Sequence, residues 1–394
     1  MSIYPIIYTF DMLLWLIIAV NVAYILCFAV TTALPAKNHH FTTSKQQHSF
    51  LILIPAYHED AVIAHTVETI IHQDYPQELF HVAVISDHMS AETNQLLAKL
   101  PITLLQPSFQ KSSKAKALQF AMNKVEGLYD FVVVLDADNI VASDYISQLN
   151  AIAQPSMVIQ CHRTAKNADN DVAVLDGISE EINNTIFRKG HNRMGLSSAL
   201  IGSGMCFDYQ WFKNNVNELK SAVEDRELEA LLMKQHIYIH YAEDIYVLDE
   251  KVSSSDNFQR QRQRWMSGQV QSFFQMVPYL PKAIIDGNIN YIDKTIQQAL
   301  IPRSILLVII PILCVIAPLT SYILHHTSYI YSLKWWILLF CLCIALFMAI
   351  PKQMRKQSLF RKLLSFPSLV WKMVLNLQKI DRKNTDFIHT KHGE

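Results

Sequence analysis

Two aspartates one residue apart follow an apolar run in the middle of the chain. Residues 131–135 read Phe-Val-Val-Val-Leu, and Asp136 and Asp138 come directly after them. A Val-rich run is typical of a strand buried on both faces, and open α/β sheets bind ligands at the carboxyl ends of such strands. Side chains two residues apart in an extended segment point the same way, so these carboxylates can converge where a cation balances their charge. We interpret the pair as a divalent-metal site for a phosphorylated ligand. The alternative is a surface turn formed by Asp138 and Asn139.

Two further charged motifs lie downstream. Glu224 and Asp225 open a predicted helix, and a later stretch contains Gln261, Arg264 and Trp265. In a helix, those last three residues occupy positions i, i+3 and i+4 and share one face. A carboxylate can act as a general base, and an arginine can bind phosphate. The alternatives are that the acidic pair only favours a helix N-terminus and that the basic residues only contact lipid phosphates.

Strand-like and helix-like segments alternate between residues 50 and 250. Strands are expected at residues 49–57, 81–86, 102–105, 131–135 and 157–160, and helices at 60–72, with Asp60 as N-cap, and 113–125. Such alternation predicts an α/β fold with a mostly parallel sheet and helices on both faces. The chain lacks the glycine-rich phosphate motifs of Walker-type ATPases and dinucleotide enzymes, which disfavours both classes.

Composition indicates membrane segments. Apolar residues make up 51% of the chain and charged residues 17%, against roughly a quarter in ordinary soluble domains. The formal net charge is +0 and the pI is about 7.3, which gives no overall attraction to nucleic acid. We therefore expect no nucleic-acid partner.

Three apolar runs, at residues 12–36, 304–324 and 333–350, are long enough to cross a bilayer as helices. Basic residues follow the first run at Lys37 and Lys45 and the third at Lys352 and Arg355. The positive-inside rule places both of these segments in the cytosol. The sequence predicts a multi-pass protein of the cell membrane with its central part in the cytosol. A buried core helix is the alternative for any one run.

With these motifs in this order, residues 49–270 resemble the family 2 glycosyltransferases. The resemblance is to the membrane-bound branch, which includes hyaluronan, chitin and cellulose synthases and bacterial exopolysaccharide enzymes. It rests on Asp-x-Asp at 136–138, Glu-Asp at 224–225 and Gln-x-x-Arg-Trp at 261–265, between one leading and two trailing apolar runs. The resemblance implies an α/β fold of the GT-A type, with a Rossmann-like mixed sheet, flanked by transmembrane helices.

The resemblance implies a donor site. Asp87 would hydrogen-bond the base, Asp136 would lie on the sugar-nucleotide side, and Asp138 would hold the metal, Mg²⁺ or Mn²⁺, with Asp136 as a second ligand. Lys114 or Lys116 would lie near the nucleotide. They stand in the position of the family's Gly-Lys-x-x-Ala-Leu stretch, where Ala115 replaces the usual Gly. The donor set is Pro55, Ala56, Tyr57, Glu59, Asp87, Lys114, Lys116 and Asp136.

The resemblance also implies an acceptor side. Asp225 would be the general base, and Glu224 keeps the family's Glu-Asp pair intact although Val223 replaces the preceding Thr. Residues 387–392 loosely resemble a C-terminal loop that covers the nucleotide in some synthases. The residues that would border the diphosphate and the acceptor are Gln261, Arg264 and Trp265, together with Glu224.

These roles imply an inverting, metal-dependent glycosyltransferase that moves a sugar from a nucleotide sugar, a UDP-sugar, to a polysaccharide or lipid-linked acceptor. Expected partners are the donor, the acceptor, the lipid bilayer and other polysaccharide assembly or export proteins. Two alternatives stay open: single-sugar transfer to a polyprenyl or other lipid carrier, and a non-catalytic membrane scaffold with a degenerate transferase domain. The expected domains are an N-terminal transmembrane helix (1–36), a cytosolic GT-A catalytic domain (37–255), Gln-x-x-Arg-Trp and interfacial helices (256–299), two transmembrane helices (300–351) and a cytosolic basic tail (352–394).

Overall fold

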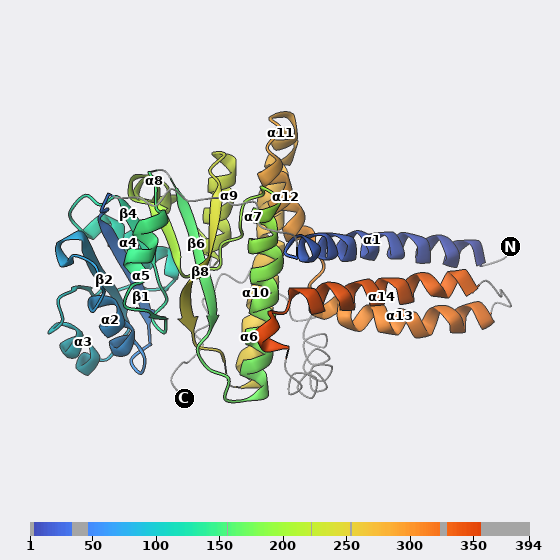
Figure 1. Cartoon of the computed structure of the whole chain (residues 1–394), viewed down its shortest axis with the longest axis horizontal. Coiled ribbons are helices and arrows are strands. Elements are labelled where there is room, and N and C mark those ends of the chain that lie inside the picture. The colour runs from blue at the N-terminus through green and yellow to red at the C-terminus, as the bar shows by residue number, and fades with distance from the viewer. Residues whose placement is uncertain are drawn as a thin grey trace.

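The computed structural model describes residues 4–33, 46–155, 157–221, 223–252, 254–323 and 329–355. One part is a sheet covered by helices, and the other is a bundle of three long helices that projects from it (Figure 1). The expected nucleotide-covering loop at 387–392 and most of the expected tail at 352–394 lie outside the described residues.

Among the described residues, eight strands form one mixed sheet in the order β3-β2-β1-β4-β7-β6-β8-β5. Strands β3, β2, β1 and β4 are parallel, whereas β7 pairs antiparallel with β4 and β6. Strand β8 is parallel to β6, and β5 is antiparallel to β8. The parallel half agrees with the alternating pattern of the sequence, and the antiparallel strands make the sheet more mixed than expected. The bounds are β1 Phe50–Tyr57, β2 Phe80–Asp87, β3 Thr103–Leu105, β4 Phe131–Val134, β5 Ile140–Val141, β6 Val158–Ala165, β7 Met205–Asp208 and β8 Ile239–Asp249.

Helices cover both faces of the sheet because its central strands are apolar on both sides. Alternate residues of β1 point to opposite faces, so Ile52 and Ile54 join one core and Leu51 and Leu53 the other. The first core contains residues of α2, α3 and α5, and the second contains residues of α4, α8, α9 and α12. The helices of this part are α2 Ile63–Ile71, α3 Ala91–Leu97, α4 Lys114–Lys124, α5 Tyr145–Ile152, α6 Asp171–Asn183, α7 His191–Arg193, α8 Tyr209–Asn215, α9 Glu224–Lys234, α10 Ser255–Met276, α11 Leu280–Ile285 and α12 Ile289–Ala299.

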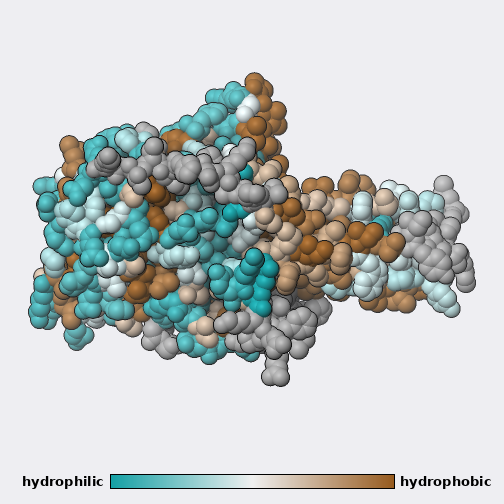
Figure 2. Space-filling model, viewed as in Figure 1, coloured by the Kyte–Doolittle hydropathy of each residue, from teal (hydrophilic) through white to brown (hydrophobic). Residues whose placement is uncertain are grey.

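In the part of the chain that the structure describes, three helices are long and apolar enough to cross a membrane: α1 (Tyr4–Thr31), α13 (Arg303–Ile323) and α14 (Tyr329–Ala349). They coincide with the three apolar runs of the sequence, although α1 begins earlier than expected. Their buried residues form one core with residues of α6 and of the π-helix η2 (Asn184–Gly190). This shared core attaches the bundle to the sheet part. Figure 2 shows hydrophobic residues along the bundle and mainly hydrophilic residues over the sheet part.

One local prediction near the first strand is wrong. Helix α2 begins at Ile63, and Asp60 does not cap it. The carboxylate of Asp60 instead accepts a hydrogen bond from the backbone N–H of Ser90 at 2.8 Å, which ties the loop after β1 to the loop after β2. The same tie accounts for the lowered pKa of Asp60, since hydrogen bonds from Thr93 and Ser90 outweigh the effect of burial.

Candidate active site

A cavity of about 300 Å³ lies at the carboxyl ends of β1, β2 and β4 and is bordered by α9 and α10. Parallel strands deliver their carboxyl ends to one edge of a sheet, which brings loops distant in sequence together. The exposed side chain of Lys116 donates to the carbonyl oxygen of Lys111 at 2.5 Å and does not line the cavity. All the other residues predicted for the site line it: Pro55, Ala56, Tyr57, Glu59, Asp87, Lys114, Asp136, Asp138, Glu224, Asp225, Gln261, Arg264 and Trp265.

Three carboxylates meet in this cavity. Oxygen atoms of Asp136, Asp138 and Asp249 lie within 4.8 Å of one another. Strand β4 ends at Val134, so the first two residues lie in a turn and not in the extended segment expected. Asp249, the last residue of β8, was not predicted. A group of carboxylate oxygens at this spacing is a fitting ligand set for a divalent cation such as Mg²⁺ or Mn²⁺.

Hydrogen bonds hold the acidic turn in place. The side-chain oxygen of Asn139 accepts from the backbone N–H of Asp136 at 3.0 Å. Its amide nitrogen donates to Asp138 Oδ1 and to Asp249 Oδ1, each at 3.2 Å. The other oxygen of Asp138 accepts from the backbone N–H of Glu250 at 2.9 Å. The turn after β4 and the end of β8 are therefore fixed to each other without a ligand.

Lys114 is the cation next to this acidic group. It is in the first turn of α4, whose N-cap is Ser113. Its ammonium pairs with Asp136, donates to the carbonyl oxygen of Gly202 at 2.7 Å and lies 3.6 Å from Glu224 Oε1. Burial alone would lower the pKa of Lys114, but the charges of Asp136 and Glu224 raise it overall. The lysine therefore stays protonated and can bind a phosphate oxygen.

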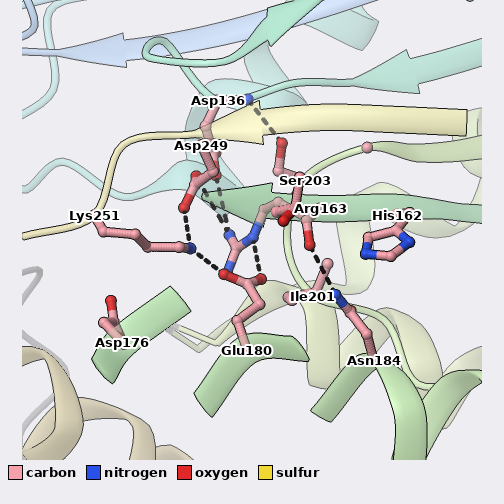
Figure 3. A network of polar contacts seen from close by, with 12 residues as sticks. Asp136, His162, Arg163, Asp176, Glu180, Asn184, Ile201, Ser203, Asp249 and Lys251 are labelled. Carbon is pink, nitrogen blue, oxygen red and sulfur yellow. Dashed lines mark hydrogen bonds and ion pairs between the residues drawn. The ribbon is translucent and has the colours of Figure 1, made fainter. Parts of the chain in front are cut away.

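A second cationic group, Arg163 and Lys251, which the sequence analysis missed, contacts the acidic group (Figure 3). Arg163 of β6 donates to Glu180 Oε1 at 2.7 Å, and its Nη1 lies 3.8 Å from both Asp136 Oδ2 and Asp249 Oδ1. Lys251 pairs with Glu180 and lies 2.6 Å from Asp249 Oδ2. Burial opposes the charge of Arg163, yet Asp249 and Glu180 raise its pKa overall. This buried network surrounds the candidate metal ligands with fixed charges.

Glu224 and Asp225 occupy the first turn of α9, as the sequence predicted. Burial raises the pKa of Glu224 to about 7, and the charge of Lys114 only partly opposes this rise. The loop at Gly202 passes close by with a φ of 85°, and a Cβ added there would lie 3.8 Å from Asp225 Oδ2, Glu224 Oε1 and Lys114 Nζ. Two carboxyl groups with different surroundings are thus placed beside a cation.

Helix α10 presents Gln261, Arg264 and Trp265 to the cavity, which confirms that they share one helix face. The guanidinium of Arg262, the residue directly after Gln261, lies 4.7 Å from the centre of the Trp265 ring and pairs with Asp176. Burial lowers the pKa of Arg264, an effect that the carboxylate of Glu224 opposes. The indole is therefore held between the cavity and a cation.

The ends of β1 and β2 supply a different surface, with Tyr57 and Asp87 in the cavity wall. His88 Nδ1 lies 2.6 Å from Asp87 Oδ1. His58 and His88 have φ values of 55° and 57°, a left-handed conformation that is uncommon for residues other than glycine. No local pattern in the sequence marks the contact of His88 with Asp87.

Comparison with known proteins agrees with the fold and the motifs. Residues 47–268 match the family model described as "Glycosyltransferase like family 2". The mixed sheet and the charged cavity define a glycosyltransferase of the GT-A type. The chain belongs to family 2 of the glycosyltransferases.

Two curated relatives are beta-monoglucosyldiacylglycerol synthases, from Trichormus variabilis and from Nostoc sp. Each is 25% identical over 233 residues, which covers 56% of this chain and 49% of the relative. The chain thus spans about half the length of the curated relatives it matches. The mannosyltransferase PcManGT from Pyrobaculum calidifontis, solved with GDP-Man and Mn²⁺, superposes with a TM-score of 0.55 at 14% identity. The superposition covers 92% of this chain and 98% of that one, and it shows the shared fold.

Proposed function

We propose that this enzyme is an inverting, metal-dependent glycosyltransferase that moves a sugar from a UDP-sugar to a lipid-linked acceptor at the membrane. The observation that carries the proposal is one cavity that holds three converging carboxylates, flanking cations and a separate Glu-Asp pair. Those are the groups needed to bind a diphosphate, stabilise it as it leaves and deprotonate a hydroxyl.

Charge balance supports a divalent cation. Nine carboxyl groups and seven lysine or arginine side chains line the cavity, a surplus of two negative charges when all are ionised. A nucleoside diphosphate would add more negative charge, so the cavity suits a nucleotide together with a metal ion. Asp136, Asp138 and Asp249 would hold that ion, which supplies Lewis-acid stabilisation of the leaving diphosphate. The relative solved with GDP-Man and Mn²⁺ supports this choice for a shared fold.

The residues of the chain divide the remaining work. Asp87 and Tyr57 would bind the base at the ends of β1 and β2, and Lys114 and Arg264 would bind diphosphate oxygens. Asp225 would take the proton from the acceptor hydroxyl. The hydroxyl oxygen then bonds to the anomeric carbon as the bond to the diphosphate breaks. One displacement with one base inverts the configuration at that carbon.

The membrane end supports a lipid acceptor and a single addition. Three of the described helices are long and apolar enough to cross a bilayer, and the curated relatives are named as synthases of a glucosyl diacylglycerol. We propose that the helices anchor the enzyme with its active site facing the cytosol, in the domain arrangement expected from the sequence. Other polysaccharide assembly or export proteins stay as proposed partners. Product analysis separates the alternatives, because a single addition gives one product and polymer synthesis gives a ladder.

The test measures nucleoside diphosphate released by purified membranes across a panel of nucleotide sugars with Mn²⁺. Asp225→Asn should lower the rate by roughly 10²–10⁴-fold, as loss of a general base does. Asp138→Ala should abolish metal-dependent turnover. Lys114→Ala should be severely impaired, whereas Lys116→Ala, the matched control outside the cavity, should be near wild type. Wild-type turnover in both aspartate variants would overturn the mechanism.

A further inference from the structure

A second and larger cavity, of about 1010 Å³, lies where the helical bundle meets the sheet part. Its wall is mostly apolar, with side chains from both sides of the boundary. Figure 1 shows α6 and α10 next to the ends of α1, α13 and α14 at this place. The apolar lining includes Ile178 and Ile182 of α6, Phe258 of α10, Leu307 of α13, and Leu346 and Phe347 of α14. Its volume is at the upper end of the roughly 300–1,000 Å³ of small-molecule sites.

The cavity reaches the surface that faces the bilayer. Phe347, which lines it, is 59% exposed among the described residues. Exposed apolar residues of a membrane-spanning helix contact lipid, so a hydrocarbon chain can enter from the side. A water-soluble ligand would gain little binding free energy from such a wall, because only apolar ligand surface is stabilised by contact with apolar side chains.

Five arginines also line this cavity, which an apolar chain alone does not explain. They come from five different parts of the chain, and only two carboxyl groups among the described residues of the lining, Asp225 and Glu229, accompany them. Arg262 also pairs with Asp176, which lies outside the lining, so the surplus is two positive charges. Charged groups next to an apolar wall are costly unless they meet counter-charges. The arginines are Arg188, Arg226, Arg262, Arg303 and Arg355.

Three of these arginines have donors to spare. Arg188 Nε, Arg262 Nε and Arg303 Nη1 are buried and have no hydrogen-bond acceptor among the described residues. Arg188 is only 4% exposed, and its Nη1 donates to the side chain of Asn184. Nη2 of Arg303 donates to Asn183 Oδ1 at 2.6 Å, which fixes the guanidinium at the start of α13. Fixed, unsatisfied guanidinium donors are suited to phosphate oxygens.

The two cavities share a wall. Arg188, Asp225, Arg226, Arg262 and Trp265 line both of them. A ligand in the larger cavity therefore ends next to the proposed base and next to the donor site.

We propose that the larger cavity binds the acceptor, a membrane lipid with a phosphate between its hydrocarbon chain and a hydroxyl-bearing headgroup. The chain lies against the apolar wall, the phosphate binds the arginines, and the hydroxyl reaches Asp225. This inference rests on the proposed function, because it names the substrate class of the same reaction. An uncharged lipid would leave the arginine surplus unbalanced.

The test measures binding of fluorescent phosphatidylglycerol to the purified full chain in detergent. Arg303→Gln should weaken binding roughly tenfold, since a charge-assisted hydrogen bond is lost. Leu307→Trp, which fills the apolar part, should weaken it as well. The matched control is Arg260→Gln, an exposed cation of α10 outside the cavity, which should bind as the wild type does. Diacylglycerol and inorganic phosphate should compete poorly, because each lacks one half of the ligand.

Binding of UDP with Mn²⁺ is measured on the same samples and separates this inference from the proposed function. Intact nucleotide binding by Arg303→Gln, with weakened lipid binding, supports the lipid site. Unchanged lipid affinity in both cavity variants would overturn it, as would diacylglycerol competing as well as phosphatidylglycerol. Thermal unfolding checks that each variant is folded, and Arg303→Lys, which keeps the charge, should lose less affinity than Arg303→Gln.

Discussion

Gly268 of α10 packs against Val223, the residue directly before the Glu-Asp pair. A Cβ at this position would lie 2.4 Å from Cγ1 of Val223. Non-bonded carbon atoms keep about 3.5 Å apart, so Gly268→Ala forces α10 or Val223 to move by about 1 Å. Valine has few alternative rotamers because it is branched at Cβ, so the backbone must absorb much of the shift.

The shift would reach both halves of the active site. Helix α10 carries Gln261, Arg264 and Trp265, and Val223 leads into Glu224 and Asp225. A misplacement of about 1 Å can cost roughly 10²-fold in rate, equal to about 2.7 kcal/mol of transition-state stabilisation. Overpacking itself lowers the free energy of unfolding by about 1–3 kcal/mol. We expect the variant to fold and to turn over about a hundredfold more slowly.

The assay is nucleoside diphosphate release by purified membranes, with thermal unfolding measured in parallel. Val223→Ala removes the methyl group that the new Cβ meets, so adding it to Gly268→Ala should recover much of the lost rate. Val223→Ala alone is the matched control. Wild-type turnover in Gly268→Ala would refute the reasoning, and so would a double variant no faster than Gly268→Ala itself.

Three further predictions concern pH, the metal and the attachment of α1. Burial raises the pKa of Glu224 to about 7, so its carboxyl ionises as pH rises through 7 and adds a negative charge next to the proposed base, which favours loss of the acceptor's proton. The value of kcat/KM should rise there, and a pH profile of Glu224→Gln that keeps the inflection would contradict this. Asp249→Asn removes a charged oxygen from the acidic group, so the Mn²⁺ concentration for half-maximal rate should rise at least about tenfold in a metal titration; an unchanged titration would exclude Asp249 as a ligand. Gly190→Ala would place a Cβ 2.6 Å from the backbone oxygen of Phe28 in α1. The variant should lower the midpoint of thermal unfolding by several degrees, because this contact is overpacked. An unchanged midpoint would show that the two segments move apart at no cost.

The first half of the sheet could be predicted from the sequence because its strands are continuous apolar runs. The expected strands at 49–57, 81–86 and 131–135 end within one residue of β1, β2 and β4 at both ends. Parallel strands end at one edge, so the carboxylates after them could be expected to meet there. Helix α4 was equally clear, since Ser113 caps it and accepts from the backbone N–H of Lys116. Local pattern sufficed for these elements.

The other half of the site depends on pairings that no local pattern reveals. Strand β8 mixes buried and exposed residues along its length, and Glu243 and Asp244 interrupt its apolar residues in the middle. Its register with β6 shifts between Cys161 and His162. The contact of Asp249 with the acidic turn can be predicted only when the pairing of β8 is known. The sequence therefore predicted the pair after β4 and missed the third carboxylate.

The neutral composition of the chain conceals two cavities of opposite charge. A net charge of +0 argued against a polyanionic partner, but the donor cavity carries a surplus of carboxylates and the boundary cavity a surplus of arginines. The first surplus calls for a cation to accompany a nucleotide, and the second calls for an anion on an apolar chain. Asp225 and Trp265 lie in the wall between them. A reaction that joins a sugar to a phosphate-bearing lipid needs its base at such a junction, because the donor's anomeric carbon and the acceptor's hydroxyl must meet there while their phosphates stay apart.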